Sequence, residues 1–286
     1  MSYKIITDSC CDLSEQMCQE LGLSVVPMCV TVSGKTVNRF TEQELKNIYT
    51  AFRAKEETST AAANPQDWEN AIAPVLEQGE DALVLAFSSG LSTTYQSAVI
   101  AAQELMDRYP GRTVKVVDTL SASMGQGLFV YYACKKRDEG LSLEALAAWC
   151  EGKKQNVCQW FTVDDLFFLK RGGRVSAATA VAGTMLQIKP VLHVDKEGHL
   201  IAMSKVRGRK ASLQALAKKM AETQIPGEND VVFVSHGDCL EDAQALAEML
   251  KTQCGVKEVV IHYIGGVIGS HSGPGTVALF FIGNER

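Results

Sequence analysis

The sequence predicts an α/β fold with two domains, divided near residue 155. Apolar, β-branched runs alternate with helical patterns along the first half, and each run ends in small polar residues that open the next helix. This order is typical of a parallel, doubly wound sheet. After about Trp149, two basic stretches and two strands joined by a short turn indicate a second domain of different construction. The domains are therefore predicted over residues 1–155 and 156–286.

Strands and helices alternate in the first domain. Strands are predicted at 3–7, 82–87 and 114–117, with a further apolar, β-branched stretch at 23–32. Helices are predicted at 13–21, from Thr41, at 65–78, from the segment 88–94 through 106, and at 121–138. Thr41 and Glu44 have the spacing of a capping box. The segment 55–65 has no apolar periodicity and is predicted to be a loop.

The second domain is predicted to contain fewer helices. Its strands are expected at 189–194, 200–203, 231–234, 258–264 and 276–282, and its helices at 211–223 and 238–250. A turn at 195–198 joins the first two strands. The glycine-rich segment 265–275, which contains His271, connects the last two.

The composition excludes several classes of protein. With 46% hydrophobic residues, 21% charged residues and a net charge of -5, the chain is neither disordered nor a general binder of nucleic acid. No stretch reaches the roughly 20 apolar residues of a membrane-spanning helix. Nine cysteines without paired ligand spacing argue against zinc. Together with the lack of a signal-like N-terminal segment, they predict a cytoplasmic protein.

Three groups of small polar residues, at 7–9, 88–93 and 118–121, each follow a predicted strand. In a parallel sheet these hydroxyls and helix-opening amides gather outside the carboxyl ends of the strands, where they can bind an anion. Ser89 and Ser92 belong to the second group. The alternative is that these residues are ordinary helix caps. The presence of three groups favours a shared anion site.

Basic residues and one histidine form a second set of candidates. Arg171 and Arg174 flank two glycines and can pair with phosphate or carboxylate, although a solvated surface loop would have the same composition. The stretch 205–210, which contains Arg207, is predicted to be a solvated face or an interaction patch. His271 lies among glycines and is predicted to face a ligand rather than to be a packing residue.

Common enzyme motifs are missing. The chain has no GxSxG elbow, no GxxxxGK[ST] phosphate loop and no HExxH helix. A hydrolase or acyltransferase with Ser92 as nucleophile and His271 as base stays open, because catalytic triads are defined by geometry rather than by order in the chain.

Seven segments, in order along nearly the whole chain, resemble the DegV family. They are Thr7-Asp8-Ser9 with Asp12-Leu13, 88–92 with 94–98, Gly125-Gln126-Gly127, Leu169 with Gly172-Gly173-Arg174, Ile188-Lys189-Pro190, Lys205-Val206-Arg207, and 269–275. The resemblance implies a parallel three-layer α/β/α N-terminal domain and a mixed-sheet α/β C-terminal domain.

The resemblance also implies a function. Such proteins bind one long-chain fatty acid in the cleft between the domains, without a cofactor or a metal, and supply no catalysis of their own. In bacteria with the matching kinase, which resembles dihydroxyacetone kinases, the bound acid is presented for phosphorylation to an acyl phosphate. The expected partners are this fatty acid kinase and, transiently, a membrane surface. A regulatory lipid sensor is the alternative.

Site residues carry over from the family by position. The carboxylate contacts correspond to Thr58, in the segment 58–61, and to Ser92, with Ser89 as a second hydroxyl. His271 and Arg174 are expected near the carboxyl end of the ligand. Contacts with the head group or the kinase are expected from Arg171, Arg174 and Arg207. The sequence departs from the family pattern at Thr60-Ala61, where the family has Gln-Pro, and at Thr93, where it has Gly.

Overall fold

A parallel sheet of four strands forms the first half of the molecule. The computed structural model describes residues 2–175, 187–284 and 286. The strand order is β2-β1-β6-β7, with β1 at Tyr3–Asp8, β2 at Ser24–Val26, β6 at Asp81–Ala86 and β7 at Val114–Asp118. These strands agree with the prediction for the first domain.

Helices cover both faces of this sheet, because successive residues of a strand point to opposite sides. Ile5 and Leu83 pack with the residues of α5 (Met124–Asp138) and α6 (Leu143–Lys153). Ile6 and Val84 pack with those of α3 (Pro65–Glu77) and α4 (Thr94–Arg108). The predicted three-layer arrangement is confirmed.

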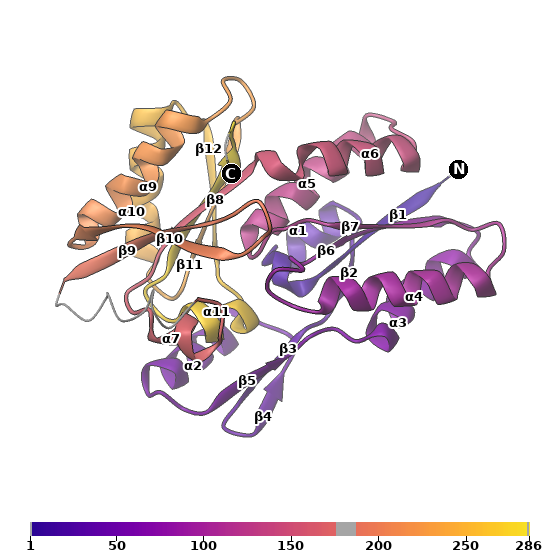
Figure 1. Ribbon diagram of the computed structural model, residues 1–286, viewed down its shortest axis with the longest axis horizontal. Coiled ribbons are helices and arrows are strands. Elements are labelled where there is room, and N and C mark those ends of the chain that lie inside the picture. The colour runs from indigo at the N-terminus through magenta and orange to yellow at the C-terminus, as the bar shows by residue number, and fades with distance from the viewer. Residues whose placement is uncertain (1, 176–186, 285) are drawn as a thin grey trace.

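A small antiparallel sheet, in the order β4-β3-β5, lies beside the first half (Figure 1). It contains β3 (Cys29–Val32), β4 (Lys35–Val37) and β5 (Thr58–Ala61). The prediction of a loop over 55–65 is therefore wrong at β5. Its two threonines suit a strand, and its pairing with β3, in which Val30 opposes Thr60, is a long-range contact that apolar periodicity does not reveal.

The first two helices of the chain precede strand β5. Helix α1 (Glu15–Glu20) follows the 3-10 turn η1 (Ser9–Cys11), and α2 (Glu42–Arg53) lies between β4 and β5 in the sequence. The capping box predicted at Thr41 and Glu44 is present, since each residue's side chain bonds to the other's backbone N–H.

A mixed sheet of six strands forms the second half, in the order β10-β9-β8-β13-β11-β12. The strands are β8 (Val157–Thr162), β9 (Ile188–Val194), β10 (Leu200–Arg207), β11 (Val231–His236), β12 (Glu258–Tyr263) and β13 (Val277–Ile282). Only the pair β11–β12 is parallel among the pairs described. Helices α9 (Arg209–Thr223) and α10 (Leu240–Cys254) cover one face of this sheet.

Helix α5 lies against the other face and is shared by both halves. Its residues Leu128 and Phe129 belong to one apolar core with Leu83 of β6 and Phe280 of β13. The predicted boundary at residue 155 falls in the 3-10 turn η2 (Lys154–Asn156), after the parallel sheet and before the six-stranded one. The division into domains at that point stays a prediction.

Several elements are not among those predicted from the sequence: α6, β8, α7 (Phe167–Arg171) and α11 (Gly266–Ser272). Helix α11 is unexpected because glycine weakens helices by about 1 kcal/mol per residue. Its glycines allow close packing instead, since a Cβ on Gly269 would lie 2.5 Å from the Tyr49 hydroxyl oxygen. Tertiary contacts therefore determine this helix.

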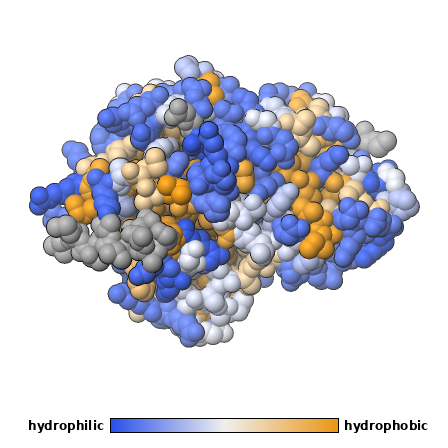
Figure 2. All heavy atoms as spheres, in the orientation of Figure 1, coloured by the Kyte–Doolittle hydropathy of each residue, from blue (hydrophilic) through white to orange (hydrophobic). Residues whose placement is uncertain are grey.

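The molecular surface in the view of Figure 2 is largely hydrophilic, with hydrophobic residues in small, separate groups. Among the helices of the described residues, none is long and apolar enough to cross a membrane.

Candidate functional site

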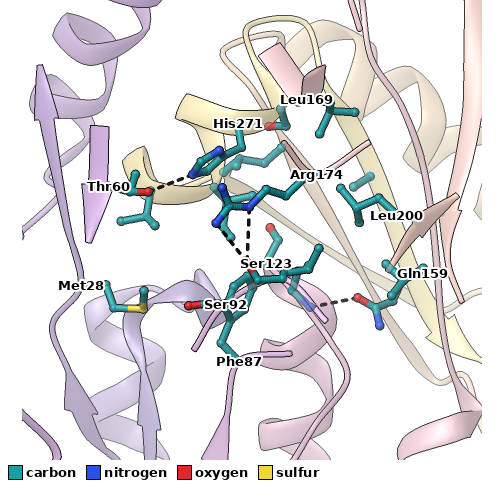
Figure 3. Close-up of a pocket in the computed structure, with 18 of the residues that line it drawn as sticks. Met28, Thr60, Phe87, Ser92, Ser123, Gln159, Leu169, Arg174, Leu200 and His271 are labelled. Atoms are coloured by element: carbon teal, nitrogen blue, oxygen red, sulfur yellow. Dashed lines mark hydrogen bonds between the residues drawn. The ribbon is translucent and has the colours of Figure 1, made fainter. Parts of the chain in front are cut away.

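A cavity of about 450 Å³ lies between the two halves. Its volume is within the range of roughly 300–1,000 Å³ typical of small-molecule sites. Most of its wall is apolar, with Met28, Phe87, Leu91, Phe161, Leu169, Val194, Leu200, Ile264, Val267, Ile268 and Phe280. Polar side chains gather at one side, where Figure 3 shows Thr60, His271, Arg174 and Ser92 around the same space.

Ser92 lies in the loop that follows β6, at the carboxyl end of the parallel sheet. Its Oγ accepts a hydrogen bond from the Thr94 backbone N–H at 3.2 Å and lies 2.8 Å from Thr94 Oγ1. When Thr94 donates in the second contact, the Ser92 hydroxyl hydrogen stays free. Ser92 therefore acts as a helix-opening residue, and in that orientation it also offers one donor to the cavity.

His271, near the end of α11, contacts Thr60 of β5. The His271 Nε2 and Thr60 Oγ1 atoms lie 2.9 Å apart (Figure 3), whereas Nδ1 is buried and has no partner among the described residues. Burial, with the positive charges of Arg174 and Arg171, lowers the pKa of His271 to about 4. The ring is therefore neutral at neutral pH.

Gly172 leaves room for the His271 ring. Gly172 follows α7, and a Cβ on this residue would overlap His271 Nδ1. Glycine is therefore required here for close approach rather than for its backbone angles, because its φ is -73°.

Arg174 supplies a positive charge to the cavity. Its Nε and Nη2 atoms donate to the Leu91 carbonyl at 3.3 and 3.1 Å, and Nη1 donates to the Gly172 carbonyl. Both acceptors are neutral, and no acidic side chain of the described residues forms an ion pair with Arg174. Burial of the guanidinium group lowers its pKa. A half-buried cation without an acidic partner is suited to an anionic ligand.

The chain's similarity to known proteins agrees with this architecture. The model of the family described as "Uncharacterised protein, DegV family" matches residues 2–284. The chain belongs to the DegV family. It is 40% identical to a DegV domain-containing protein of Clostridium perfringens, over 99% of this chain and 98% of the relative.

Solved structures of other DegV proteins have the same fold. One is reported as fatty acid binding of a DegV family protein from Thermus thermophilus, with a TM-score of 0.88 and 35% identity over 99% of this chain and 100% of that one. A hypothetical protein from Thermotoga maritima, reported to reveal fatty acid binding function, has a TM-score of 0.87 and 29% identity over 99% and 100% of the two chains. The predicted resemblance and the two-domain α/β fold are thus confirmed.

The structure brings together four of the residues proposed from the DegV resemblance. Ser89, Ser92, His271 and Arg174 all line the cavity. The Ser89 backbone N–H donates to Asp118 Oδ1 at 3.2 Å, and the residue itself is exposed. Ser92 is half-buried and lies among the polar groups described above.

Thr58 does not line the cavity, in contrast to the expectation from the DegV pattern. Its hydroxyl accepts a hydrogen bond from Arg171 Nη2 at 2.7 Å. Thr60 lines the cavity in its place, because the two residues lie on one face of β5 but are separated by about 7 Å along the strand. If 58–61 had been predicted as a strand, Thr58 and Thr60 would have been placed on the same face, and Thr60 would have been an equal candidate for the carboxylate contact.

Two of the predicted arginines lie outside the cavity lining. Arg171 is exposed, bonds to Thr58 and to the Ser270 carbonyl, and stacks near the Phe168 ring. Arg207 is exposed at the end of β10, one of the two edge strands of the six-stranded sheet. Both are accessible to a partner.

Ser123 and Gln159 are among the polar residues of the cavity lining that were not candidates from the sequence. Ser123, before α5, donates from Oγ to Asp12 Oδ2 at 2.5 Å. Burial raises the pKa of Asp12 to about 7. Gln159 of β8 lies in the wall on the side away from Thr60 (Figure 3). A glutamine within an apolar strand is the signal that could have identified it.

The described residues contain no cluster of three or more His, Cys, Asp or Glu side chains able to hold a metal ion.

Proposed function

We propose that this DegV protein binds a long-chain fatty acid between its two domains and presents the carboxylate to a fatty acid kinase. The observation that carries the proposal is an apolar cavity with hydroxyls on one side, beside an arginine that forms no ion pair with the described residues. The ligand must therefore combine a long apolar part with one anionic end. Fatty acid binding reported for the Thermus and Thermotoga relatives supports the same ligand class.

The energy of transfer explains why the tail must be enclosed. Each buried methylene contributes about 0.8 kcal/mol, so a tail of about 15 carbons gains roughly 12 kcal/mol on leaving water. A carrier must bury most of that tail to compete with a lipid bilayer. The apolar wall from Phe87 through Phe161 to Leu200 supplies such an environment.

The head group requires oriented donors. With its hydrogen on Nε2, neutral His271 donates to Thr60 Oγ1, and the Thr60 hydroxyl then has its own hydrogen for the carboxylate. Ser92 offers a second donor, and Arg174 the compensating charge. In this arrangement His271 orients Thr60 rather than acting as a base.

A hydrolase is less well supported by this geometry. Ser92 bonds to Thr94, His271 bonds to Thr60, and no hydrogen bond joins Ser92 to His271 in the described part of the chain. A histidine with a pKa of about 4 is also a weak general base at neutral pH.

The kinase step requires an exposed carboxylate end and a docking surface. The partner would transfer a phosphoryl group from a nucleoside triphosphate to a carboxylate oxygen, giving an acyl phosphate and a nucleoside diphosphate. Exposed Arg171 and Arg207 are the proposed contacts with such a kinase, since arginine pairs well with acidic groups.

The test is to express the protein in bacteria, purify it natively, extract it with solvent and identify fatty acids by mass spectrometry. We expect stoichiometric fatty acid in the wild type and an affinity loss in Ser92→Ala equivalent to about 1–3 kcal/mol. A lipid-free wild type that also fails to bind added fatty acid would refute the proposal. Acyl phosphate formed with a kinase of this kind would distinguish the carrier from a lipid sensor.

A further inference from the structure

Three cross-strand pairs of β8 and β13 form successive rows on one face of the six-stranded sheet. They are Val157–Ile282, Gln159–Phe280 and Phe161–Ala278. The apolar members of these rows pack in one core with α5, whereas their neighbours in the sequence, Cys158 and Phe281, pack on the opposite face with α9 and α10. The rows are separated by about 7 Å along the strands.

The fatty-acid cavity ends at the middle row. Phe161, Ala278, Gln159 and Phe280 line it, but Val157 and Ile282 do not. In Figure 3, Gln159 lies on the side of the cavity away from Thr60 and Met28. The middle row is therefore far from the polar groups proposed to bind the carboxylate.

A second cavity, of about 410 Å³, begins at the next row. Val157 and Ile282 form an apolar part of its lining, together with Phe129 of α5 and Trp149 of α6. The rest of its lining is largely charged, with Lys135, Lys136, Glu139, Lys153, Glu228 and Asp230. Phe129 and Trp149 are stacked with ring centroids 6.1 Å apart. Apolar surface thus continues beyond the middle row, on the same face of the sheet and under the same helix.

Helix α5 closes the space between the two cavities at Gly125. A Cβ at this position would lie 2.5 Å from Gln159 Oε1 and 2.8 Å from Phe280 Cδ1, so only glycine lets the helix contact these side chains. Gln159 is held from both ends, because Oε1 accepts from the Ala122 N–H at 3.1 Å and Nε2 donates to Ser121 Oγ at 3.0 Å. Phe280 is buried.

We propose that Gly125, Gln159 and Phe280 form an end wall that limits the length of the acyl chain, and that the second cavity can receive the methyl end of a longer chain once this wall is opened. The inference rests on the proposed fatty-acid function. Gln159 is the rigid part of the wall, since its hydrogen bonds fix the side chain. Phe280 is the part whose size can be changed without breaking a hydrogen bond.

The test uses Phe280→Leu and Phe280→Ala, which remove increasing volume from the end wall. Each purified protein is incubated with an equimolar mixture of saturated fatty acids that differ by two carbons, and the bound acids are identified by native mass spectrometry. Two additional buried methylenes correspond to about a fifteenfold preference. We expect the bound population to move to longer chains, further in Phe280→Ala than in Phe280→Leu.

Phe281→Leu is the matched control. It removes the same volume from the same strand but on the opposite face, so it should retain the wild-type distribution of chain lengths. If Phe280→Leu binds fatty acid with an unchanged distribution, the end wall is refuted although fatty-acid binding stands. If neither the wild type nor any variant binds fatty acid, the proposed function fails and the inference fails with it.

Discussion

Replacement of Thr60 by valine tests the arrangement of the carboxylate site most directly. Thr60→Val keeps the shape of the side chain but removes the hydroxyl that lies 2.9 Å from His271 Nε2 and faces the cavity. A hydrogen bond to a charged group contributes about 1.5–3 kcal/mol, so fatty-acid affinity should fall about 10- to 150-fold. The substitution also leaves the buried His271 ring without its hydrogen-bond partner.

The control is Thr58→Val on the same strand. The Thr58 hydroxyl accepts from exposed Arg171 and lies outside the cavity lining. Thr58 is half-buried, but it lies away from the proposed ligand. A substitution there should change the free energy of binding by less than about 0.5 kcal/mol, so affinity should change by no more than about twofold. Displacement of a fluorescent fatty acid measures both affinities. A larger loss in Thr58→Val than in Thr60→Val would refute the assignment of the carboxylate to Thr60.

Three further predictions concern residues around the cavity. Gly172→Ala should destabilise the protein by about 1–3 kcal/mol in urea unfolding, because its Cβ overlaps His271, whereas Gly152→Ala, which meets no atom, should be neutral or stabilising. Arg174→Gln should weaken binding of a fatty acid about tenfold but leave binding of its methyl ester unchanged in the same titration; equal losses for both ligands would exclude a charge contact. Burial raises the pKa of Asp12 from 3.8 to about 7, so its contribution to stability is present at low pH and is lost as the pH rises through about 7. In the wild type, the free energy of unfolding should therefore decrease with pH, and Asp12→Asn should remove up to about 4 kcal/mol of that decrease. If the free energy of unfolding has the same pH dependence in both proteins, the prediction is wrong.

The fold was predictable from the sequence wherever packing leaves a local pattern. Fully buried strands such as β6 and β13 are continuous apolar runs, and the capping box at Thr41 is a short-range motif. Helix α11 and strand β5 were not predictable in this way. Glycines in α11 allow contact with Tyr49, and β5 depends on a partner strand far away in the sequence.

The candidate site shows the same division. Hydroxyls at the carboxyl end of a parallel strand identify Ser92 from topology alone. The choice between Thr58 and Thr60 depends on which of the two meets His271, a residue more than two hundred positions later. Gln159 and Gly125 became candidates only when the structure placed α5 against β8 and β13.

The position of α5 restricts how a ligand can enter and leave. A hinge motion that parts the two sheets would strip this helix from one of them and bring side chains such as Leu85 or Phe233 into water. Exposure of apolar surface requires about 25 cal/mol for each Å², so the free energy of such an opening would rise with every further residue that becomes exposed. Entry and release of the ligand would expose less apolar surface if only α7 and α11 rearranged, at the place where they lie beside the small sheet. Kinetics of release should accordingly respond to substitutions in these short helices rather than to those along α5.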